Sequence, residues 1–171
     1  MKETKKIVLA GGPCCGKTTL INELKKRGYE IIDESAREIL AENIKIEYAE
    51  IQKKIFLRQL EKEARAKEKI KDLIFLDRGY IDGVAYCQLK LGYIPEPLKS
   101  FDFRNQYDII FILDLLPFEK DGLRVEKDED EARTVHEAIV SAYKSFGYDV
   151  VVVPVMPIEK RVEFILGRVG N

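Results

Sequence analysis

Residues 6–19 read KIVLAGGPCCGKTT, and this stretch decides the fold. A short apolar run, which predicts a buried strand over residues 6–10, leads into a glycine-rich turn. Residues 11–18 match the pattern G-x-x-x-x-G-K-[ST], and the residues from 18 to 27 read as a helix that Gly28 closes. A strand, this turn and a helix in direct succession are the context in which the pattern forms a phosphate-binding loop.

Each position of this loop has a physical reason. Glycines let the backbone turn with its N–H groups pointing inward, and the N-terminus of the next helix adds its positive dipole end to the same anion cradle. Lys17 reaches the β- and γ-phosphates of a nucleoside triphosphate, and the Thr18 hydroxyl group binds Mg²⁺. We interpret the two adjacent cysteines as small fillers, with a redox switch as the alternative. The predicted nucleotide-binding residues are Gly11, Gly12, Pro13, Cys14, Cys15, Gly16, Lys17, Thr18 and Thr19.

Beyond the loop, apolar runs that predict strands alternate with segments of helical period, the pattern of an α/β fold with a parallel sheet. Strands are expected at residues 6–10, 30–33, 73–77, 108–114 and 149–154, and helices at 18–27, 35–40, 47–71, 80–91, 131–146 and 157–169. The sequence therefore predicts a single domain over residues 1–171, a three-layer doubly wound parallel sheet of five strands in the order 2-3-1-4-5. A helical region at about residues 35–72 is expected on the acceptor side, and a polar lid at about 117–133.

The charge balance excludes several classes of protein. The 171 residues contain 29 Lys and Arg against 30 Asp and Glu, so no excess of positive charge is available for a polybasic nucleic-acid binder. A hydrophobic fraction of 46% excludes an acidic disordered chain. No apolar run approaches the roughly 18 residues that span a bilayer, and the first one is too short for a signal peptide. We expect a cytoplasmic protein without a nucleic-acid partner or membrane span, and leave its oligomeric state open.

A Mg²⁺–nucleotide complex also needs a carboxylate across from Thr18, at the end of a neighbouring strand. Asp77 and Asp114 each follow an apolar run, and we favour Asp77 as the metal-binding residue because Arg78 follows it. The acid can hold magnesium-bound water or an acceptor hydroxyl, and the guanidinium can clamp a phosphate. A solubilising pair at the strand end is the alternative for Asp77 and Arg78. Neither aspartate is followed by the glutamate that many motor-type ATPases use to activate water.

Residues 77–88, DRGYIDGVAYCQ, resemble the D-R-x…A-Y-x-Q segment of thymidylate kinases and the related deoxynucleoside kinases. The loop departs from thymidylate kinases, which typically carry an acidic residue where this chain has residues 13–15, PCC. Residues 11–13 and 33–38, GGP and DESARE, resemble instead the NadR-like AAA family of small ATPases and kinases. Further matches to that family are residues 121–124, Arg133, His136 and residues 147–148.

The resemblance covers nearly the whole chain and implies the P-loop nucleoside triphosphate hydrolase/kinase fold. Members of the NadR-like family include nicotinamide riboside kinase domains and many proteins of unknown substrate. The resemblance thus implies nucleotide binding and phosphotransfer, and leaves the acceptor open.

Several residues are candidates for the acceptor side. Glu34 and Arg37 follow the second strand at its carboxyl end, where open α/β sheets bind ligands. In the resembling kinases an acidic residue here contacts or deprotonates the acceptor hydroxyl, and helix capping is the alternative for Glu34. Arg37 either binds a substrate phosphate or pairs with Glu34. Arg78 and Arg104 are the other two predicted substrate residues, and Arg104 precedes the fourth strand.

The polar lid carries two arginines that are candidates for catalysis. A kinase must exclude water from the transferred phosphoryl group, and lid arginines commonly neutralise the charge that develops on its oxygens. Arg124 and Arg133 therefore join Lys17, Asp77 and Arg78 as predicted catalytic residues, with an acidic surface loop as the alternative for the lid. We interpret His136, the only histidine, as structural.

Two functions follow from these patterns. The first is a kinase that transfers the γ-phosphoryl group of ATP·Mg²⁺ to a nucleoside, nucleotide or vitamin precursor. The second is an NTPase or a nucleotide-dependent switch that binds a protein or lipid partner without a small-molecule acceptor. The guanine-specifying pattern N-K-x-D is absent, which favours ATP over GTP as the cofactor.

Overall fold

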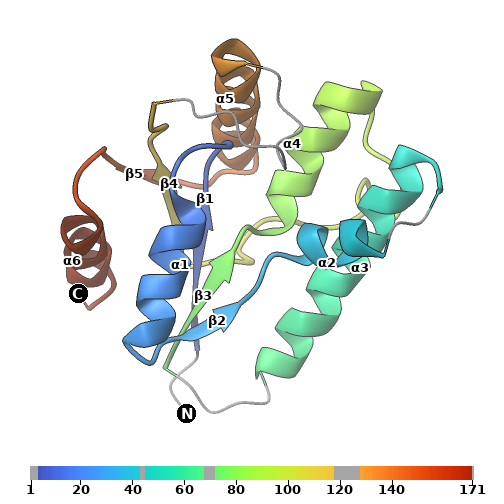
Figure 1. Cartoon of the computed structure of the whole chain (residues 1–171). Helices are drawn as coiled ribbons and strands as arrows, with labels where there is room; N and C mark the ends of the chain where they lie inside the picture. Colours follow the sequence, from blue (N-terminus) through green and yellow to red (C-terminus); the bar gives the residue numbers. More distant parts are fainter. Residues whose placement is uncertain (1–3, 43–44, 68–71, 118–127, 171) are drawn as a thin grey trace.

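The computed structural model describes residues 4–42, 45–67, 72–117 and 128–170. In this part of the chain a parallel sheet runs in the order β2-β3-β1-β4-β5. This confirms the predicted five-stranded sheet and its strand order (Figure 1). The strands are β1 (Lys5–Ala10), β2 (Glu30–Ile32), β3 (Leu73–Asp77), β4 (Ile109–Leu113) and β5 (Val150–Val153).

The central strand β1 places the predicted phosphate loop beside the end of β3. Residues 7–10 of β1 have no solvent exposure. They are all apolar, as a strand that is covered on both faces must be. In the parallel register Leu9 lies beside Asp77, and the N–H group of Arg78 donates to the Leu9 carbonyl oxygen at 3.1 Å. The carboxyl ends of β1 and β3 therefore bring the loop and the Asp77–Arg78 pair to the same edge of the sheet.

Helices cover both faces of the sheet, as Figure 1 shows. They are α1 (Lys17–Lys26), α2 (Ser35–Ala41), α3 (Tyr48–Lys67), α4 (Tyr80–Leu91), α5 (Glu129–Ser145) and α6 (Ile158–Val169). Apolar residues of α1 and α6 pack on the face to which Ile7 and Leu9 point. Those of α3, α4 and α5 pack on the face to which Val8 and Ala10 point, because successive strand residues alternate between the two faces. None of the helices in the described ranges is long and apolar enough to cross a membrane.

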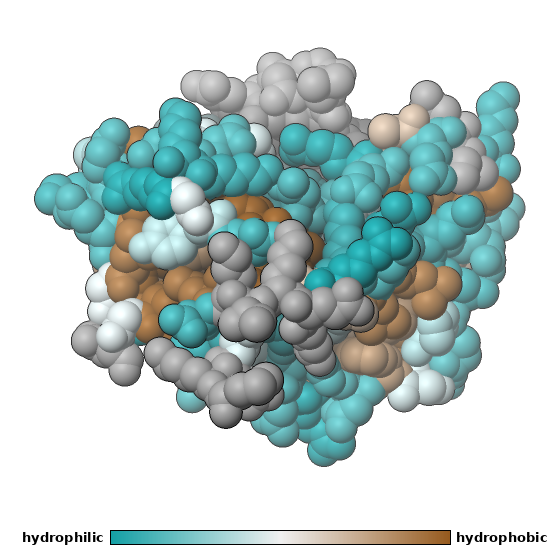
Figure 2. Space-filling view, turned by 90° about the horizontal axis from the view of Figure 1, so that it is seen from below, coloured by the Kyte–Doolittle hydropathy of each residue, from teal (hydrophilic) through white to brown (hydrophobic). Residues whose placement is uncertain are grey.

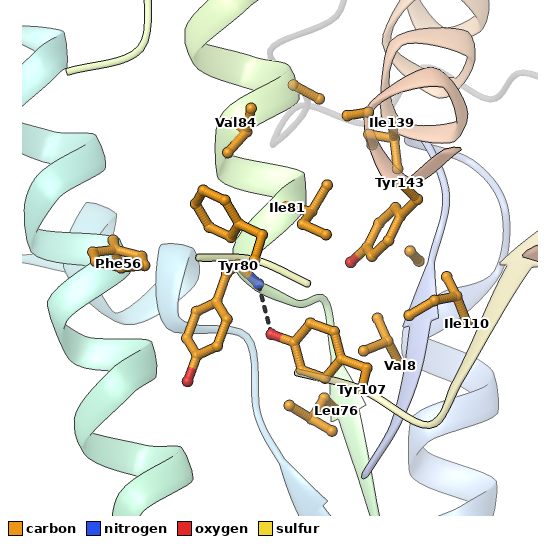
Figure 3. Packing of buried hydrophobic residues seen from close by; sticks show 14 of the residues in the cluster. Val8, Phe56, Leu76, Tyr80, Ile81, Val84, Tyr107, Ile110, Ile139 and Tyr143 are labelled. Carbon is orange, nitrogen blue, oxygen red and sulfur yellow. Dashed lines mark hydrogen bonds between the residues drawn. The ribbon is translucent and has the colours of Figure 1, made fainter. Parts of the chain in front are cut away.

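The core on the second of these faces is rich in aromatic rings. Figure 3 shows Val8, Leu76 and Ile110 of the sheet facing Ile81 of α4 and Ile139 and Tyr143 of α5. The Tyr107 hydroxyl oxygen accepts a hydrogen bond from the N–H group of Tyr80, the first residue of α4, at 2.8 Å. Polar atoms thus enter this core only where a partner satisfies them, and they fix the start of α4.

The start of helix α5 differs from the expected one. Helix α5 starts at Glu129 rather than residue 131, because Asp128 caps it and accepts a hydrogen bond from the N–H group of Glu131 at 2.9 Å. Residues 129–133 of the expected lid are therefore helical, and residues 118–127 lie outside the described ranges. Helix α3 is described to Lys67, since residues 68–71 also lie outside the described ranges.

The end of the molecule at which β1 starts is mainly hydrophilic, with apolar areas between the charged side chains (Figure 2).

Candidate functional site

The loop between β1 and α1 has the geometry of an anion cradle. Gly11 and Gly16 adopt positive φ angles of 135° and 79°, and a Cβ atom on Gly11 would lie 2.9 Å from the Leu113 carbonyl oxygen. The Lys17 side chain is buried, and its Nζ atom donates to the carbonyl oxygen atoms of Gly11 at 3.1 Å and Gly12 at 3.4 Å. The ammonium group is thus held against the loop backbone.

The loop rests on Arg161, a residue of α6 that the sequence reasoning missed. Its guanidinium group is buried and donates to the carbonyl oxygens of Cys15 at 2.6 Å, Pro154 at 3.1 Å and Asp114 at 3.3 Å. Burial lowers the pKa of Arg161, but a guanidinium stays charged at any physiological pH. Arg161 therefore ties the loop to the ends of β4 and β5 and adds positive charge behind it. An arginine on the apolar face of a helix was the signal available in the sequence.

His136 of α5 also contacts the loop. The N–H group of Gly12 donates to His136 Nδ1 at 3.2 Å, and a Cβ atom on Gly12 would lie 2.8 Å from the His136 Cβ atom. Burial lowers the pKa of His136, which favours the neutral imidazole that this bond requires. Helix α5 thus packs directly against the phosphate loop.

The two loop cysteines have different environments. Cys15 is buried in the core under α1 and α6, and its Sγ atom lies 3.5 Å from Lys17 Nζ. Cys14 is half-buried and adopts a positive φ angle of 62° at the turn. The burial of Cys15 fits the filler interpretation, while Cys14 lines a cleft described below.

Asp77 ends β3 with a carboxyl group that is buried and incompletely bonded. Its Oδ1 atom has no hydrogen-bond partner among the described residues. Burial raises the pKa of Asp77, although the positive charge of Lys17 opposes that shift. A buried polar atom without a partner costs free energy, so this oxygen fits a ligand that arrives with the nucleotide, such as Mg²⁺ or its water.

Arg78 joins the end of β3 to the residue after β2. Its Nε atom donates to Glu34 Oε1 at 2.7 Å, and its NH1 atom donates to Asp82 Oδ1 at 3.3 Å. Burial opposes the charged form of Glu34, but the positive charges of Arg78 and Lys17 overcome this effect and lower its pKa. Glu34 is therefore a carboxylate at neutral pH. The helix-capping alternative is not realised, since Glu34 occupies the N-cap position of α2 without a side-chain cap bond.

Asp82, which the sequence reasoning also missed, holds Arg78 in place. It is buried, and its Oδ2 atom accepts hydrogen bonds from the N–H group of Gly79 at 3.0 Å and from the Tyr143 hydroxyl at 2.6 Å. The backbone at Arg78 has a positive φ angle of 72°, which costs free energy in a non-glycine residue. A carboxylate at the third position of a helix, typical of a capping box, was the sequence signal.

Glu63 of α3 supports both ends of the Glu34–Arg78 pair. Its buried carboxylate accepts hydrogen bonds from Lys6 Nζ at 2.8 Å, Gln59 Nε2 at 2.9 Å and the Tyr107 hydroxyl at 3.1 Å. The Gln59 Oε1 atom accepts from Ser35 Oγ at 2.7 Å, next to Glu34 in the chain. Ser35, the first residue of α2, thus bonds to α3. Through Tyr107, Glu63 also reaches the N–H group of Tyr80, two residues after Arg78.

A cavity of about 340 Å³ lies beside the Glu34–Arg78 pair, between α2, α3 and α4. Its walls are mainly apolar and aromatic, and include Tyr48, Ile51, Ile55 and Phe56 of α3 with Tyr80 and Tyr86 of α4. A cavity of this size and character is typical of a site for a small organic molecule. We call it the acceptor cavity.

A more open cleft of about 770 Å³ lies on the other side of the phosphate loop. Its lining includes Cys14 of the loop, Asp114 after β4, Val155 after β5, and Arg133 and His136 of α5. Arg133 is exposed at this cleft and pairs with Glu129 at 3.0 Å. The structure thus brings Arg133 to the phosphate-loop side, opposite the acceptor cavity.

The remaining predicted site residues are Thr18, Arg37, Arg104 and Arg124. Thr18 is exposed in the first turn of α1. Arg37 is 70% exposed and lies 3.7 Å from Glu34 Oε2, outside the lining of the acceptor cavity. Arg104 is also exposed, pairs with Asp102 at 2.9 Å and lines neither the cavity nor the cleft. Arg124 lies outside the described residues.

Comparison with protein families gives a match over most of the chain. A family profile described as an AAA domain matches residues 6–161. The chain belongs to the AAA domain family. No curated protein matches its sequence.

Solved structures resemble this AAA domain over nearly its full length. Deoxyadenosine kinase from M. mycoides, with the products dCMP and dCDP bound, is 20% identical with a TM-score of 0.64, over 96% of this chain and 98% of that one. NadR in complex with NR is 20% identical with a TM-score of 0.76, over 99% of this chain and 52% of that one. Thymidylate kinase from Candida albicans is 14% identical with a TM-score of 0.70, over 98% and 92%.

These likenesses confirm the predicted fold. The AAA domain has the P-loop fold of phosphotransferases and NTPases, and the resemblance to NadR-like proteins and thymidylate kinases holds at the level of that fold. The AAA domain described here spans about half of the length of the NadR chain that it matches.

Proposed function

We propose that this AAA domain is an ATP-dependent small-molecule kinase. The observation that carries the proposal is the position of the acceptor cavity, which adjoins Arg78 and Glu34 at the same sheet edge as the phosphate loop. An enzyme that only hydrolyses ATP needs no second site for an organic molecule. The acceptor class is that of nucleosides, nucleotides and vitamin precursors.

On the donor side, the loop backbone and Lys17 bind the β- and γ-phosphates of ATP. Thr18 and Asp77 would hold Mg²⁺, which when bound neutralises phosphate charge; the unpartnered Oδ1 atom of Asp77 supports this assignment. Arg161 fixes the loop carbonyl of Cys15 from behind. These contacts position the γ-phosphorus in line with an acceptor oxygen that comes from the cavity.

On the acceptor side, the Glu34 carboxylate accepts a hydrogen bond from the acceptor group and takes its proton. Arg78 orients Glu34 through the 2.7 Å bond from its Nε atom. Arg133 of α5, which lines the cleft beside the phosphate loop, neutralises charge on the transferred phosphoryl group in this proposal, and Arg124, outside the described residues, is proposed to share that role. The three cysteines, none of which is in a disulfide bond, support a reducing, cytoplasmic location.

A screen of acceptors tests this proposal. ATP turnover is measured alone and with each member of a panel of nucleosides, nucleotides and vitamin precursors. We expect at least one compound to raise turnover well above the acceptor-free rate, and Lys17→Ala to abolish it. Turnover that no compound raises would instead favour a bare NTPase or a nucleotide-dependent switch, and unchanged turnover in Lys17→Ala would remove the loop from the site.

A further inference from the structure

The charged groups that line the acceptor cavity occur in pairs. Its cations, among the described residues, are Arg78 and Lys90. The Arg78 guanidinium is bonded to Glu34 and Asp82, and Lys90 at the rim is bonded to Glu131 of α5 at 3.3 Å. Arg78 is therefore shared by the two carboxylates that line the cavity, and Lys90 is paired with Glu131, so each cation of this lining already has a carboxylate partner.

The rest of the wall carries no charge. Tyr48, Phe56, Tyr80 and Tyr86 contribute aromatic rings, and the buried amide of Gln52 is a neutral polar group beside Tyr48. Aromatic walls favour a flat, polarisable ligand, and the two buried amides of the lining, Gln52 and Gln59, fit a ligand with a few hydrogen-bonding atoms.

From this charge balance we infer that the acceptor is an uncharged alcohol that carries a planar ring, and is neither a phosphate monoester nor a carboxylate. The inference rests on the proposed kinase function and narrows its acceptor. In the reaction, the alcohol oxygen forms a bond to the γ-phosphorus while the bond from that phosphorus to the β,γ-bridging oxygen breaks. ADP leaves with the electron pair of that bond, and the hydroxyl proton passes to Glu34.

Other nearby cations do not change this balance. Lys17 is directed at the carbonyl groups of Gly11 and Gly12 and serves the donor phosphates. Arg37 is exposed to solvent and lies outside the cavity lining. A phosphate dianion in the cavity would lie against the Glu34 carboxylate, so it would have to displace Glu34 from Arg78. The loss of a buried charge-assisted bond predicts at least about tenfold weaker binding.

Matched pairs of compounds test the inference. Thymidine, deoxyadenosine and deoxycytidine are each compared with their own 5′-monophosphate, by calorimetric titration into the full chain and by phosphoryl transfer from ATP. We expect the uncharged member of a pair to bind at least about tenfold more tightly and to be the one phosphorylated. Equal or tighter binding of the monophosphates, or transfer to them, would overturn the inference and leave the kinase proposal standing. Transfer to neither member, with ATP hydrolysis unchanged, would count against both.

A pair of variants tests the reason. Glu34→Gln removes the charge that occupies Arg78, so we expect monophosphate binding to strengthen about tenfold while transfer to the alcohol falls. Glu38→Gln is the matched control, because Glu38 is also on α2 but pairs with Lys62 and Arg58, outside the cavity lining. Monophosphate affinity that does not rise in Glu34→Gln, or that rises equally in Glu38→Gln, would contradict the charge balance.

Arg37 provides the last arm of the test. If this exposed arginine received a phosphate of the acceptor, Arg37→Ala would weaken monophosphate binding severalfold and leave binding of the uncharged partner unchanged. We expect Arg37→Ala to leave the ratio of the two affinities as it is in the unaltered chain. A selective loss of monophosphate binding in this variant would overturn the inference.

Discussion

Glu63 offers a quantitative test of how the acceptor side is held together. In Glu63→Gln the side chain keeps its shape but loses its charge, which leaves Lys6, whose side chain is only 13% exposed, without an ionic partner. Removing one member of a buried ion pair costs about 3–5 kcal/mol, and we expect the lower end because Lys6 keeps some contact with water. For a domain of 171 residues, about 3 kcal/mol lowers Tm by roughly 6–12 °C.

Thermal and urea denaturation measure this change, with two controls. Glu61→Gln alters the same helix on its exposed side, where Glu61 pairs with Arg65 and Arg58, and we expect a change within about 0.5 kcal/mol. Adding Lys6→Met to Glu63→Gln removes the unpaired charge and should recover at least half of the lost stability. A loss below about 1 kcal/mol in Glu63→Gln, or no recovery in the double variant, would refute the reasoning.

The same variant has a kinetic consequence. Because Glu63 holds Ser35 through Gln59, next to Glu34, we expect its loss to raise the KM for the acceptor more than the KM for ATP. Ser35→Ala removes only the hydrogen bond from Ser35 Oγ to Gln59 and should reproduce the change in acceptor KM with a smaller loss of Tm. Equal changes in the two KM values would show that Glu63 acts on overall stability only.

Three further outcomes follow from the site. Asp77→Asn should lower turnover about 10²–10³-fold while nucleotide affinity stays within a few fold, measured by single-turnover kinetics and titration; a proportional loss of binding would contradict it. Gly79→Ala should lose about 1–3 kcal/mol of stability, because its Cβ would lie 2.8 Å from the Tyr143 hydroxyl oxygen, whereas Gly167→Ala, with open space around it, should not be destabilising. Because the folded pKa of Glu34 lies below its ordinary value of 4.5, its ionised form stabilises the fold above that pH, and this contribution is lost as the pH falls through the folded pKa. The difference in unfolding free energy between the unaltered chain and Glu34→Gln should shrink in the same window. A difference that stays constant as the pH falls through that window would argue against an ionised Glu34.

Most of the fold could be predicted from the sequence because its signals are local. The strands are short apolar runs, the helices show 3.6-residue periodicity, and the glycine-rich turn lies between them in a single stretch. The start of α5 was placed too late, since the acid-rich residues 129–130 look like a loop until Asp128 is recognised as a cap. Polarity alone does not distinguish a solvated loop from the first turn of a helix.

The acceptor side was predicted less completely, because its residues come from separate segments. Arg104 was placed near the acceptor by its position before β4, yet it lies on the surface with Asp102. Asp82 and Glu63 were missed, since a buried carboxylate on a charged helix has the same local pattern as an exposed one. Only burial and a partner distinguish the two.

The sequence by itself determined the phosphate loop, the parallel sheet and the pairing of a carboxylate with a guanidinium at the end of β3. Each of these signals, including the adjacency of Asp77 and Arg78, depends on residues within a few positions of one another in the chain. The tertiary structure decided which charges meet: Arg78 and Glu34 are 44 positions apart, and Arg161 reaches Cys15 across 146. Because a charge that leaves water must be paired wherever the fold places it, the partners follow from packing between elements and not from local pattern.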